Sequence, residues 1–282
     1  MQSCHYQLRG VIAMINPNSP LSSTAPLYRA EREQGSAMER IGSGRRINQA
    51  ADDPAALAIV ARMAAQFGGD TQATRNINDA ISLTQVAENS LAQVNASVSR
   101  MGELAVQAAN GSLNDSDRAN LQAEFQQLQQ NIGDIFGRTE FNGISLLANE
   151  GTVDVQAGAD RGESLGVNTI DVAARAEMVA LMTADISTLT GASTAMESRD
   201  GATDLISSFQ AQFGADQSRL ASAYQQRVSA NEVNAAASGR LADADYGSET
   251  AALVRAGILQ DSATAMLVQG NVARESALSL LR

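Results

Sequence analysis

Adjacent Cys4 and His5 are the two residues of this chain best suited to chemistry. A thiol beside an imidazole can act as a nucleophile with its base, or supply two ligands to a metal ion. The sequence has one Cys and one His, so they cannot be completed into a three-ligand set of those types or a Cys–His–acid triad. We therefore expect an unstructured N-terminus, with no catalytic residue, no metal ligand and no cofactor.

Two other short segments could be mistaken for ligand-binding loops. The stretch Gly42-Ser43-Gly44-Arg45-Arg46 has the glycines of an anion loop, but no predicted strand precedes it and no Lys follows it. The stretch Asp243-x-Asp245-x-Gly247 has the alternating acids of a calcium loop, yet the required Gly falls on Ser248 and the bidentate Glu on Val254. We interpret both segments as turns between helices.

Composition excludes further classes of function. The chain carries 20 basic residues, all Arg, against 31 acidic ones, for a net charge of −11. Without Lys there is no Schiff base and no Walker-type phosphate loop, and an acidic surface repels nucleic acid. The apolar run Val11–Ile15 is too short for a secretory signal, and we see no stretch approaching the ~20 apolar residues of a bilayer span. The chain is then cytoplasmic, or exported without a cleaved signal, and has no membrane partner.

Residues that favour the start or the end of a helix recur through the first half of the chain. Residues 1–25 look irregular, Pro26 can open a helix toward Arg40, and Ile41–Gly44 ends it. Asp53 and Pro54 are a good cap and first residue for a second helix, whose one strong breaker is Gly68-Gly69. Its apolar positions recur in steps of three and four: Leu91, Val94, Val98, Met101, Ala105 and Ala108.

The clearest apolar stripe belongs to the next helix, which the segment Asn114–Asp117 should cap. Its members follow heptad a/d spacing: Leu121, Phe125, Leu128, Ile132 and Ile135. That spacing places all five on one face of the helix, opposite a partner helix.

At the start of the second half of the chain, the spacing of apolar residues changes from a helical to an alternating pattern. In residues 152–172, apolar and polar side chains alternate on both sides of a Gly-rich connection. This pattern predicts a β-hairpin or two short strands. Helical pattern resumes near Glu177, breaks around Gly191 and Gly201, and continues from Leu205 to Tyr224. A last helix after Gly239 carries apolar residues at helical spacing: Val254, Ile258, Ala265, Val268 and Val272.

The fold class predicted is mainly α: long antiparallel helices forming a coiled-coil rod, with a small β-hairpin insert. Thin Ala-rich seams require packing against each other or against neighbouring copies.

Several segments together resemble bacterial flagellins. The matching blocks are Ile41–Asn48 with Ala51-Asp52-Asp53, Met101–Asn110, Thr139–Gly143 with Leu146-Leu147, Val155–Ala159, Asp243–Tyr246, Ile258–Gln260 and Leu278–Arg282. Each block alone is weak, but their order from Ile15 to Arg282 is that of the family. The resemblance implies a structural subunit that self-polymerises into the extracellular flagellar filament for motility, and not an enzyme.

The resemblance also implies an organisation and a set of partners. Residues 14–45 with 240–282 would form an inner terminal coiled coil, 46–239 a rod-like outer domain with the hairpin, and 1–13 a disordered extension, with Met1 or Met14 as the start. Only about residues 150–200 are available for a variable outer domain, so this is a short form. The partners implied are further copies of the chain, a secretion chaperone at the C-terminal helix, the flagellar type III export apparatus, and the filament cap and hook-associated proteins.

Three residues match positions with which many flagellins contact the innate immune receptor: Arg100, Leu104 and Glu124. The alternative is a pair of solvated charges beside a Leu at the edge of a seam, and spacing alone favours that alternative. The same face would pack against neighbouring subunits in a filament.

Some residues depart from the family pattern. Pro20, Pro26, Glu31 and Glu33 make the first helix less apolar, and Arg227, Asn231 and Asn234 occupy positions where flagellins place seam aliphatics. We expect Val228 and Val233 to take over that packing. The competing readings are a hook–filament junction protein of the same superfamily, and a non-flagellar coiled-coil adaptor or chemoreceptor-like module.

Overall fold

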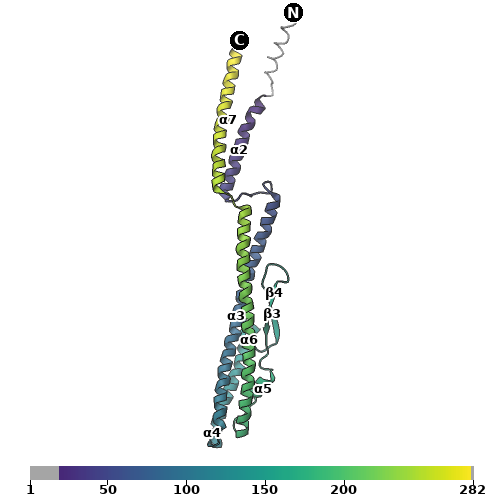
Figure 1. Cartoon of the computed structure of the whole chain (residues 1–282), viewed down its shortest axis with the longest axis vertical. Helices are drawn as coiled ribbons and strands as arrows, with labels where there is room; N and C mark the ends of the chain where they lie inside the picture. Colours follow the sequence, from purple (N-terminus) through teal and green to yellow (C-terminus); the bar gives the residue numbers. More distant parts are fainter. Residues whose placement is uncertain (1–18, 281–282) are drawn as a thin grey trace. The chain divides into compact units, whose positions relative to one another are not determined.

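The computed structural model describes residues 19–280, so Cys4, His5 and the predicted extension 1–13 lie outside it. The elements are α2 (Ser19–Ser43), α3 (Pro54–Ala108), α4 (Asp115–Arg138), β1 (Glu140–Phe141), β2 (Ile144–Ser145), β3 (Gly151–Gln156), β4 (Ser164–Thr169), α5 (Ala176–Met182), α6 (Leu189–Ala242) and α7 (Tyr246–Leu280) (Figure 1). The predicted class, mainly α with long helices and a small β-hairpin, is confirmed.

The described residues divide into two compact units. The first contains 19–64 and 236–280, and the second contains 65–235. In the first unit α2 and α7 pack side by side (Figure 1). In the second, residues of α3, α4, α5 and α6 share one hydrophobic core with the strands β3 and β4.

The predicted helix starts are confirmed at two places. The carboxylate of Asp53 accepts hydrogen bonds from the backbone N–H groups of Ala55 (3.0 Å) and Ala56 (2.9 Å) at the first turn of α3. The side chain of Asn114 accepts from the N–H of Asp117 (2.8 Å) at the start of α4. Short polar side chains thus satisfy N–H groups that a helix leaves without partners at its first turn.

The end of α3 is capped from the following helix. Arg118 is 6% exposed, and its Nε donates to the carbonyl of Ala108 (3.1 Å) while its Nη2 donates to the carbonyl of Asn110 (3.1 Å). A cation at a helix C-terminus satisfies free carbonyls and complements the helix dipole. Arg118 therefore fixes the turn between α3 and α4.

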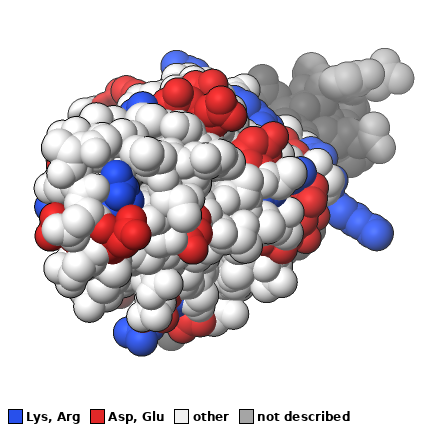
Figure 2. All heavy atoms as spheres, turned by 90° about the horizontal axis from the view of Figure 1, so that it is seen from below, with Lys and Arg blue, Asp and Glu red and all other residues white. Residues whose placement is uncertain are grey.

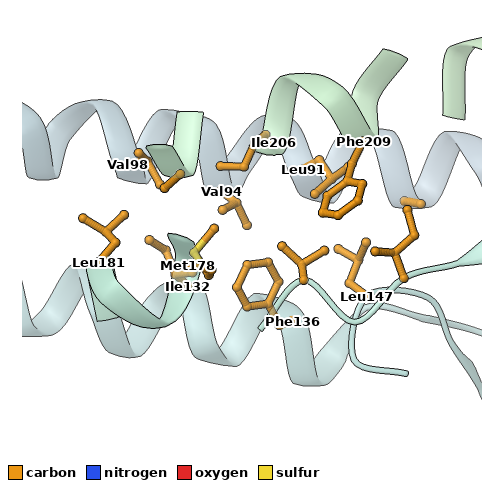
Figure 3. Close-up of a cluster of buried hydrophobic side chains, with 14 of the residues drawn as sticks. Leu91, Val94, Val98, Ile132, Phe136, Leu147, Met178, Leu181, Ile206 and Phe209 are labelled. Atoms are coloured by element: carbon orange, nitrogen blue, oxygen red, sulfur yellow. The ribbon is translucent and has the colours of Figure 1, made fainter. Parts of the chain in front are cut away.

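The core of the second unit is made where the large apolar residues of three long helices meet. Figure 3 shows them pointing toward one another: Leu91, Val94 and Val98 of α3, Ile132 and Phe136 of α4, Ile206 and Phe209 of α6, and Met178 and Leu181 of α5. All six residues of the predicted α3 seam are fully buried. Close packing of these side chains stabilises the unit.

The hairpin matches the predicted segment. Strands β3 and β4 pair antiparallel in the register Val153↔Val167 and Val155↔Leu165, so that one face of each strand meets the core. Its base is tied to the preceding loop, because Ile170 N–H donates to Leu146 O (3.1 Å) and Val172 N–H to Leu147 O (3.0 Å). The smaller β1–β2 pair, which sequence reasoning treated only as a turn, closes over Asn142 and Gly143 at positive φ.

Three predicted helix breaks, which involve four glycines, are wrong. Gly68-Gly69 lies inside α3, and Gly191 and Gly201 lie inside α6. A glycine costs a helix only about 1 kcal/mol relative to Ala, which packing of a long helix outweighs. Gly69 also has a positive role, because a Cβ there would lie 2.6 Å from the Cβ of Ala159 in the β3–β4 turn.

The start of the first helix also differs from expectation. Residues 19–25 are helical rather than irregular, and Pro26 lies inside α2 instead of opening it. The ring of proline fits helical φ but removes one backbone hydrogen bond. Packing of Ala30 and Ala37, both 2% exposed, against α7 offsets that loss.

The last helix is more apolar than its predicted apolar positions indicate. The most apolar 18-residue stretch within the segment Tyr246–Ala273 of α7 is long and apolar enough to cross a membrane by length and composition, with a mean hydropathy of 1.2. Only 6% of it is buried. The expectation that no stretch approaches a bilayer span is therefore wrong on composition, and the large exposed surface of α7 requires another explanation.

Candidate functional site

The exposed apolar face of α7 is the most conspicuous surface of the first unit. Six large apolar side chains on it are about half exposed or more: Val254 62%, Ile258 60%, Leu259 48%, Met266 72%, Val268 64% and Val272 52%. They include four of the five apolar residues that the sequence predicted for this helix. Apolar surface on this scale marks an interaction site. We call these six residues the α7 face.

Alanines form the fully buried part of the contact between the two helices. Ala30 and Ala37 of α2 are 2% exposed and Ala256 of α7 is 1% exposed. Small side chains let two helix backbones approach closely, but they bury little area. A hollow of about 410 Å³ lies where Leu259 meets Pro26, Arg29 and Glu33. The contact that holds α2 against α7 is therefore narrow.

Polar contacts join the two helices where α2 ends and α7 begins. Arg40 pairs with Glu249 (3.4 Å), and the hydroxyl of Tyr246 donates to the carbonyl of Ile41 (3.0 Å). The turn residues add backbone bonds, from Arg46 N–H to Ala242 O (2.7 Å) and from Ala244 N–H to Gly44 O (3.0 Å). Gly44 has φ +70°, which favours glycine. These bonds fix the register of α2 on α7 at one end.

Both suspected ligand loops lie in this turn region. Gly42–Arg46 ends α2, and Asp243–Gly247 joins α6 to α7, where Asp245 accepts a hydrogen bond from Gly247 N–H (2.9 Å). The interpretation of both as helix-junction turns is confirmed. Within residues 19–280, no group of three or more His, Cys, Asp or Glu side chains is placed to hold a metal ion.

The three residues with a possible receptor role lie close together on α3 and α4. Arg100 pairs with Glu124 (2.8 Å) and with Glu103 (2.7 Å), and these bonds raise the pKa of the Arg100 guanidinium. Leu104 is only 1% exposed and belongs to the core. Arg100 and Glu124 are thus accessible, whereas Leu104 is buried in the core. Whether they contact a receptor stays a prediction.

The predicted α4 stripe contacts the core unevenly. Phe125 and Ile132 are fully buried, whereas Leu121, Leu128 and Ile135 are only partly buried against the same cluster. Phe136, outside the heptad pattern, is 2% exposed. Phe125, Ile132 and Phe136 thus form the buried side of the stripe, and Leu121, Leu128 and Ile135 form its partly exposed edge.

The expected replacement of seam aliphatics on α6 is wrong in its detail. Val228 and Val233 do not take over the packing, because they are 41% and 61% exposed. Arg227 instead turns inward and makes ion pairs with Asp70 (3.3 Å) and Glu163 (3.1 Å). Spacing could have flagged Arg227 as inward-facing, but only the fold shows that two acids from distant segments receive it.

Charges elsewhere are mixed in sign. On the face seen in Figure 2, acidic and basic side chains are interspersed among uncharged residues. Several ion pairs among the described residues have both side chains exposed, such as Arg138–Asp134 (3.6 Å), and pairs of this kind add little to stability. This leaves the α7 face as the principal candidate for a functional surface.

Comparison with known proteins gives a consistent result. The model of the bacterial flagellin N-terminal helical region matches residues 15–152, and that of the C-terminal helical region matches 196–281. The flagellin of Halalkalibacterium halodurans is 38% identical over 271 residues, covering 95% of this chain and 100% of that protein. The flagellin of Salmonella muenchen is 40% identical over 57% of this chain, but the match spans only 32% of that longer protein.

Solved structures agree in fold. The crystal structure of Bacillus cereus flagellin aligns with a TM-score of 0.50 and 29% identity, over 54% of this chain and 88% of that one. A flagellar hook-associated protein from Vibrio parahaemolyticus aligns with a TM-score of 0.60 over 68% of this chain and 100% of that one. At 16% identity the second likeness concerns the fold alone. With both helical regions matched and a full-length relative at 38% identity, the chain belongs to the bacterial flagellin family.

Proposed function

We propose that this flagellin polymerises by burying the α7 face against neighbouring copies of the chain. As a flagellin it is a structural subunit of the bacterial flagellar filament, an extracellular homopolymer. The observation that carries the proposal is the set of six large apolar side chains on α7 left about half exposed or more. Full burial of such a side chain from water is worth roughly 1.5–3 kcal/mol, and burying the part of each that is still exposed would contribute about half of that to an assembly.

The occupant of this face is best taken as a second copy rather than a bilayer. The apolar segment of α7 contains three charged residues, Glu249, Arg255 and Asp261. A charge at the centre of a membrane is costly, so these residues disfavour a bilayer. A contact between helices of neighbouring copies leaves such charges at its rim. The terminal helices, residues 14–45 and 240–282, would then form an inner coiled coil, and 46–239 an outer domain.

Purified protein offers the direct test of polymerisation. Electron microscopy should reveal long helical filaments for the full chain and none for a chain lacking residues 250–282, which contain the whole α7 face. The truncated chain must keep the melting temperature of its second unit, since 65–235 does not include the deleted residues. Filaments formed without residues 250–282 would show that another surface drives assembly.

Export is the second part of the proposal. We infer passage through the flagellar type III apparatus, directed by an uncleaved segment within residues 14–40, with a chaperone bound to the C-terminal helix. A chain with one Cys has no internal disulfide to obstruct threading. An exposed apolar helix in the cytoplasm also needs cover before assembly. The filament cap and hook-associated proteins would be further partners.

Truncations in a flagellated host separate these signals. Deleting 14–40 should abolish appearance of the protein in the supernatant, and deleting 250–282 should remove chaperone binding and polymerisation. Deleting 1–13 should change neither. Normal secretion of the 14–40 deletion would overturn the assignment of the export signal.

Receptor contact is a further, separate proposal for Arg100, Leu104 and Glu124. It is supported by the accessible Arg100–Glu124 pair over a buried leucine. Replacing Arg100 by Ala should weaken receptor signalling by monomer while leaving its melting temperature unchanged, because an exposed ion pair contributes little to stability. Unchanged signalling would show that the three residues have only a structural role.

The hook–filament junction alternative rests on the fold that such proteins share with this chain. The matches to both flagellin helical regions and the full-length flagellin relative favour a filament subunit.

A further inference from the structure

The turn of the β3–β4 hairpin is held by different forces from its base. At the base, Val167, Ile170 and Val172 are buried in the core. At the turn, residues 157–163 meet the long helices through an ion pair and two alanines, next to a polar contact at the end of β3, and of these residues only Ala157 belongs to the core cluster. The two ends of one hairpin can therefore separate from the helices independently.

Arg227 of α6 is the centre of the polar contact. Its Nη1 lies 3.3 Å from Asp70 Oδ1 and its Nη2 lies 3.1 Å from Glu163 Oε1. Asp70 is on α3 and Glu163 is in the turn, so one guanidinium joins a helix, a second helix and the hairpin. The planar fork of Arg suits this double contact, and Lys could not reproduce it.

The two ion pairs differ in burial. The side chain of Asp70 is 0% exposed and that of Arg227 is 20% exposed, whereas that of Glu163 is 38% exposed. The Asp70–Arg227 pair joins two helices of the bundle and is the more buried of the two pairs. The Arg227–Glu163 pair can open when the turn alone moves away, because water reaches Glu163.

Close backbone contacts show that the turn is fitted to this site. A Cβ on Gly69 would lie 2.6 Å from Ala159 Cβ, and a Cβ on Gly158 would clash with the Glu163 carboxylate. Asn76 donates from Nδ2 to the carbonyl of Gln156 (3.1 Å). These contacts set where the turn lies, but they bury little apolar surface.

We propose that residues 157–163 form a flap that opens locally, that the Glu163–Arg227 pair is the latch that closes it, and that Asp70 holds Arg227 in position while the flap is open. When the flap opens, Arg227 loses Glu163 but keeps Asp70. The guanidinium therefore stays oriented toward the vacated position, and the turn can close again without reordering it. This inference concerns the second unit alone and does not depend on polymerisation through α7.

A thiol reporter tests the opening directly. Ala157, the first residue of the flap and 5% exposed in the core cluster, is replaced by Cys in a full-length Cys4→Ser background, and the rate of modification by a soluble thiol reagent is measured on monomer. Glu163→Gln keeps the size of the side chain but removes its charge. We expect at least about tenfold faster modification, as loss of roughly 1.4 kcal/mol would give.

Two controls distinguish local opening of the flap from a general loss of stability. Glu150→Gln breaks a comparable pair, Glu150–Arg175 (3.5 Å), near the base of the same hairpin, and should leave the rate unchanged. A thiol introduced by Ala105→Cys in the fully buried α3 seam reports unfolding of the bundle and should not respond to Glu163→Gln. Equal acceleration at both thiols, or none at the Ala157 position, would overturn the proposal.

Asp70 has its own test. Asp70→Asn leaves Arg227 without its buried anion, so closure should weaken even with Glu163 present. The thiol at the Ala157 position should then react faster than in the parent, and adding Glu163→Gln should accelerate it by clearly less than tenfold. Full additivity of the two substitutions would show that Asp70 and Glu163 act separately, and not through Arg227.

Discussion

The two units of this chain use large apolar residues in opposite ways. In the second unit, Phe125, Ile132 and Phe213 are fully or almost fully buried by the helices of the same chain. In the first, the fully buried contacts of α2 with α7 are made by alanines, while Ile258 and Val268 face outward. Both units show the same helical periodicity. What differs is whether the apolar face finds its partner within the chain or must find it on another copy.

The difference teaches that amphipathic periodicity specifies a helix and a face, but not the molecule that covers the face. A helix pair joined by alanines buries too little area to outweigh the entropy of ordering it. We therefore expect the second unit to fold by itself, and the first to become stable on assembly.

The largest effect on stability should come from removing a buried side chain from the core of the second unit. Phe125→Ala removes a fully buried ring and should lower the free energy of unfolding by about 3–5 kcal/mol. Leu128→Ala, one turn away on the same stripe but only partly buried, should cost less than half as much. Thermal melts of monomer measure both, and equal costs would contradict the burial described for α4.

Proteolysis of dilute monomer compares the units directly. An Arg-specific protease should cut after Arg255 in α7 at least about 100-fold faster than after Arg75 in α3, although both side chains are exposed. Cleavage requires local opening, and a 100-fold difference corresponds to roughly 2.7 kcal/mol in opening free energy. The fragment that remains should lie near residues 46–239. Equal cleavage rates would remove the distinction between the units.

A substitution on the α7 face should separate assembly from folding. Ile258→Ala removes apolar surface that is 60% exposed in the single chain, so the monomer melt should shift by no more than about 0.5 kcal/mol. Burial of that surface in a filament should be lost, which raises the critical concentration for polymerisation at least about tenfold. Sedimentation of filaments measures this, and an unchanged critical concentration would place Ile258 outside the contact.

The smallest effect concerns acid and the hairpin turn. Arg227 and the backbone N–H of Asp160 lower the pKa of Glu163 below its ordinary value of 4.5. The stabilisation is thus fully present above pH 4.5 and is lost as the pH falls through the lowered pKa. Asp70, Asp160 and Arg161 are the other charged groups near the site.

Hydrogen exchange of the turn in monomer checks this dependence. With Glu163→Gln as the reference at each pH, the protection attributable to the carboxylate should disappear on acidification. Protection that persists unchanged well below the ordinary carboxyl range would contradict a role for the charge.

Much of the fold could be predicted from the sequence because its signals are local. Asp53 and Asn114 mark helix starts through their own side chains, and the α3 seam from Leu91 to Ala108 is set by spacing. Glycine is ambiguous in this respect. Gly69 reads as a breaker in sequence, whereas in the fold it makes room for Ala159.

The candidate sites were less predictable because they depend on distant segments. The six residues of the α7 face are recognisable as apolar, but their exposure depends on which side of α7 the helix α2 covers. Arg227 looked like a polar intrusion into a seam, and its role requires Asp70 and Glu163, 157 residues and 64 residues away along the chain. Spacing within one helix carries no information about either acid.

The alanine contact between α2 and α7 has a mechanical consequence. Alanine has no side chain beyond Cβ, so the ridges that oppose translation of one helix along another are shallow. The register is fixed where Arg40 meets Glu249 and Tyr246 meets Ile41. Load applied along the axis of the pair is therefore carried at that end, while the rest of the contact can slide by small amounts and yield elastically instead of breaking.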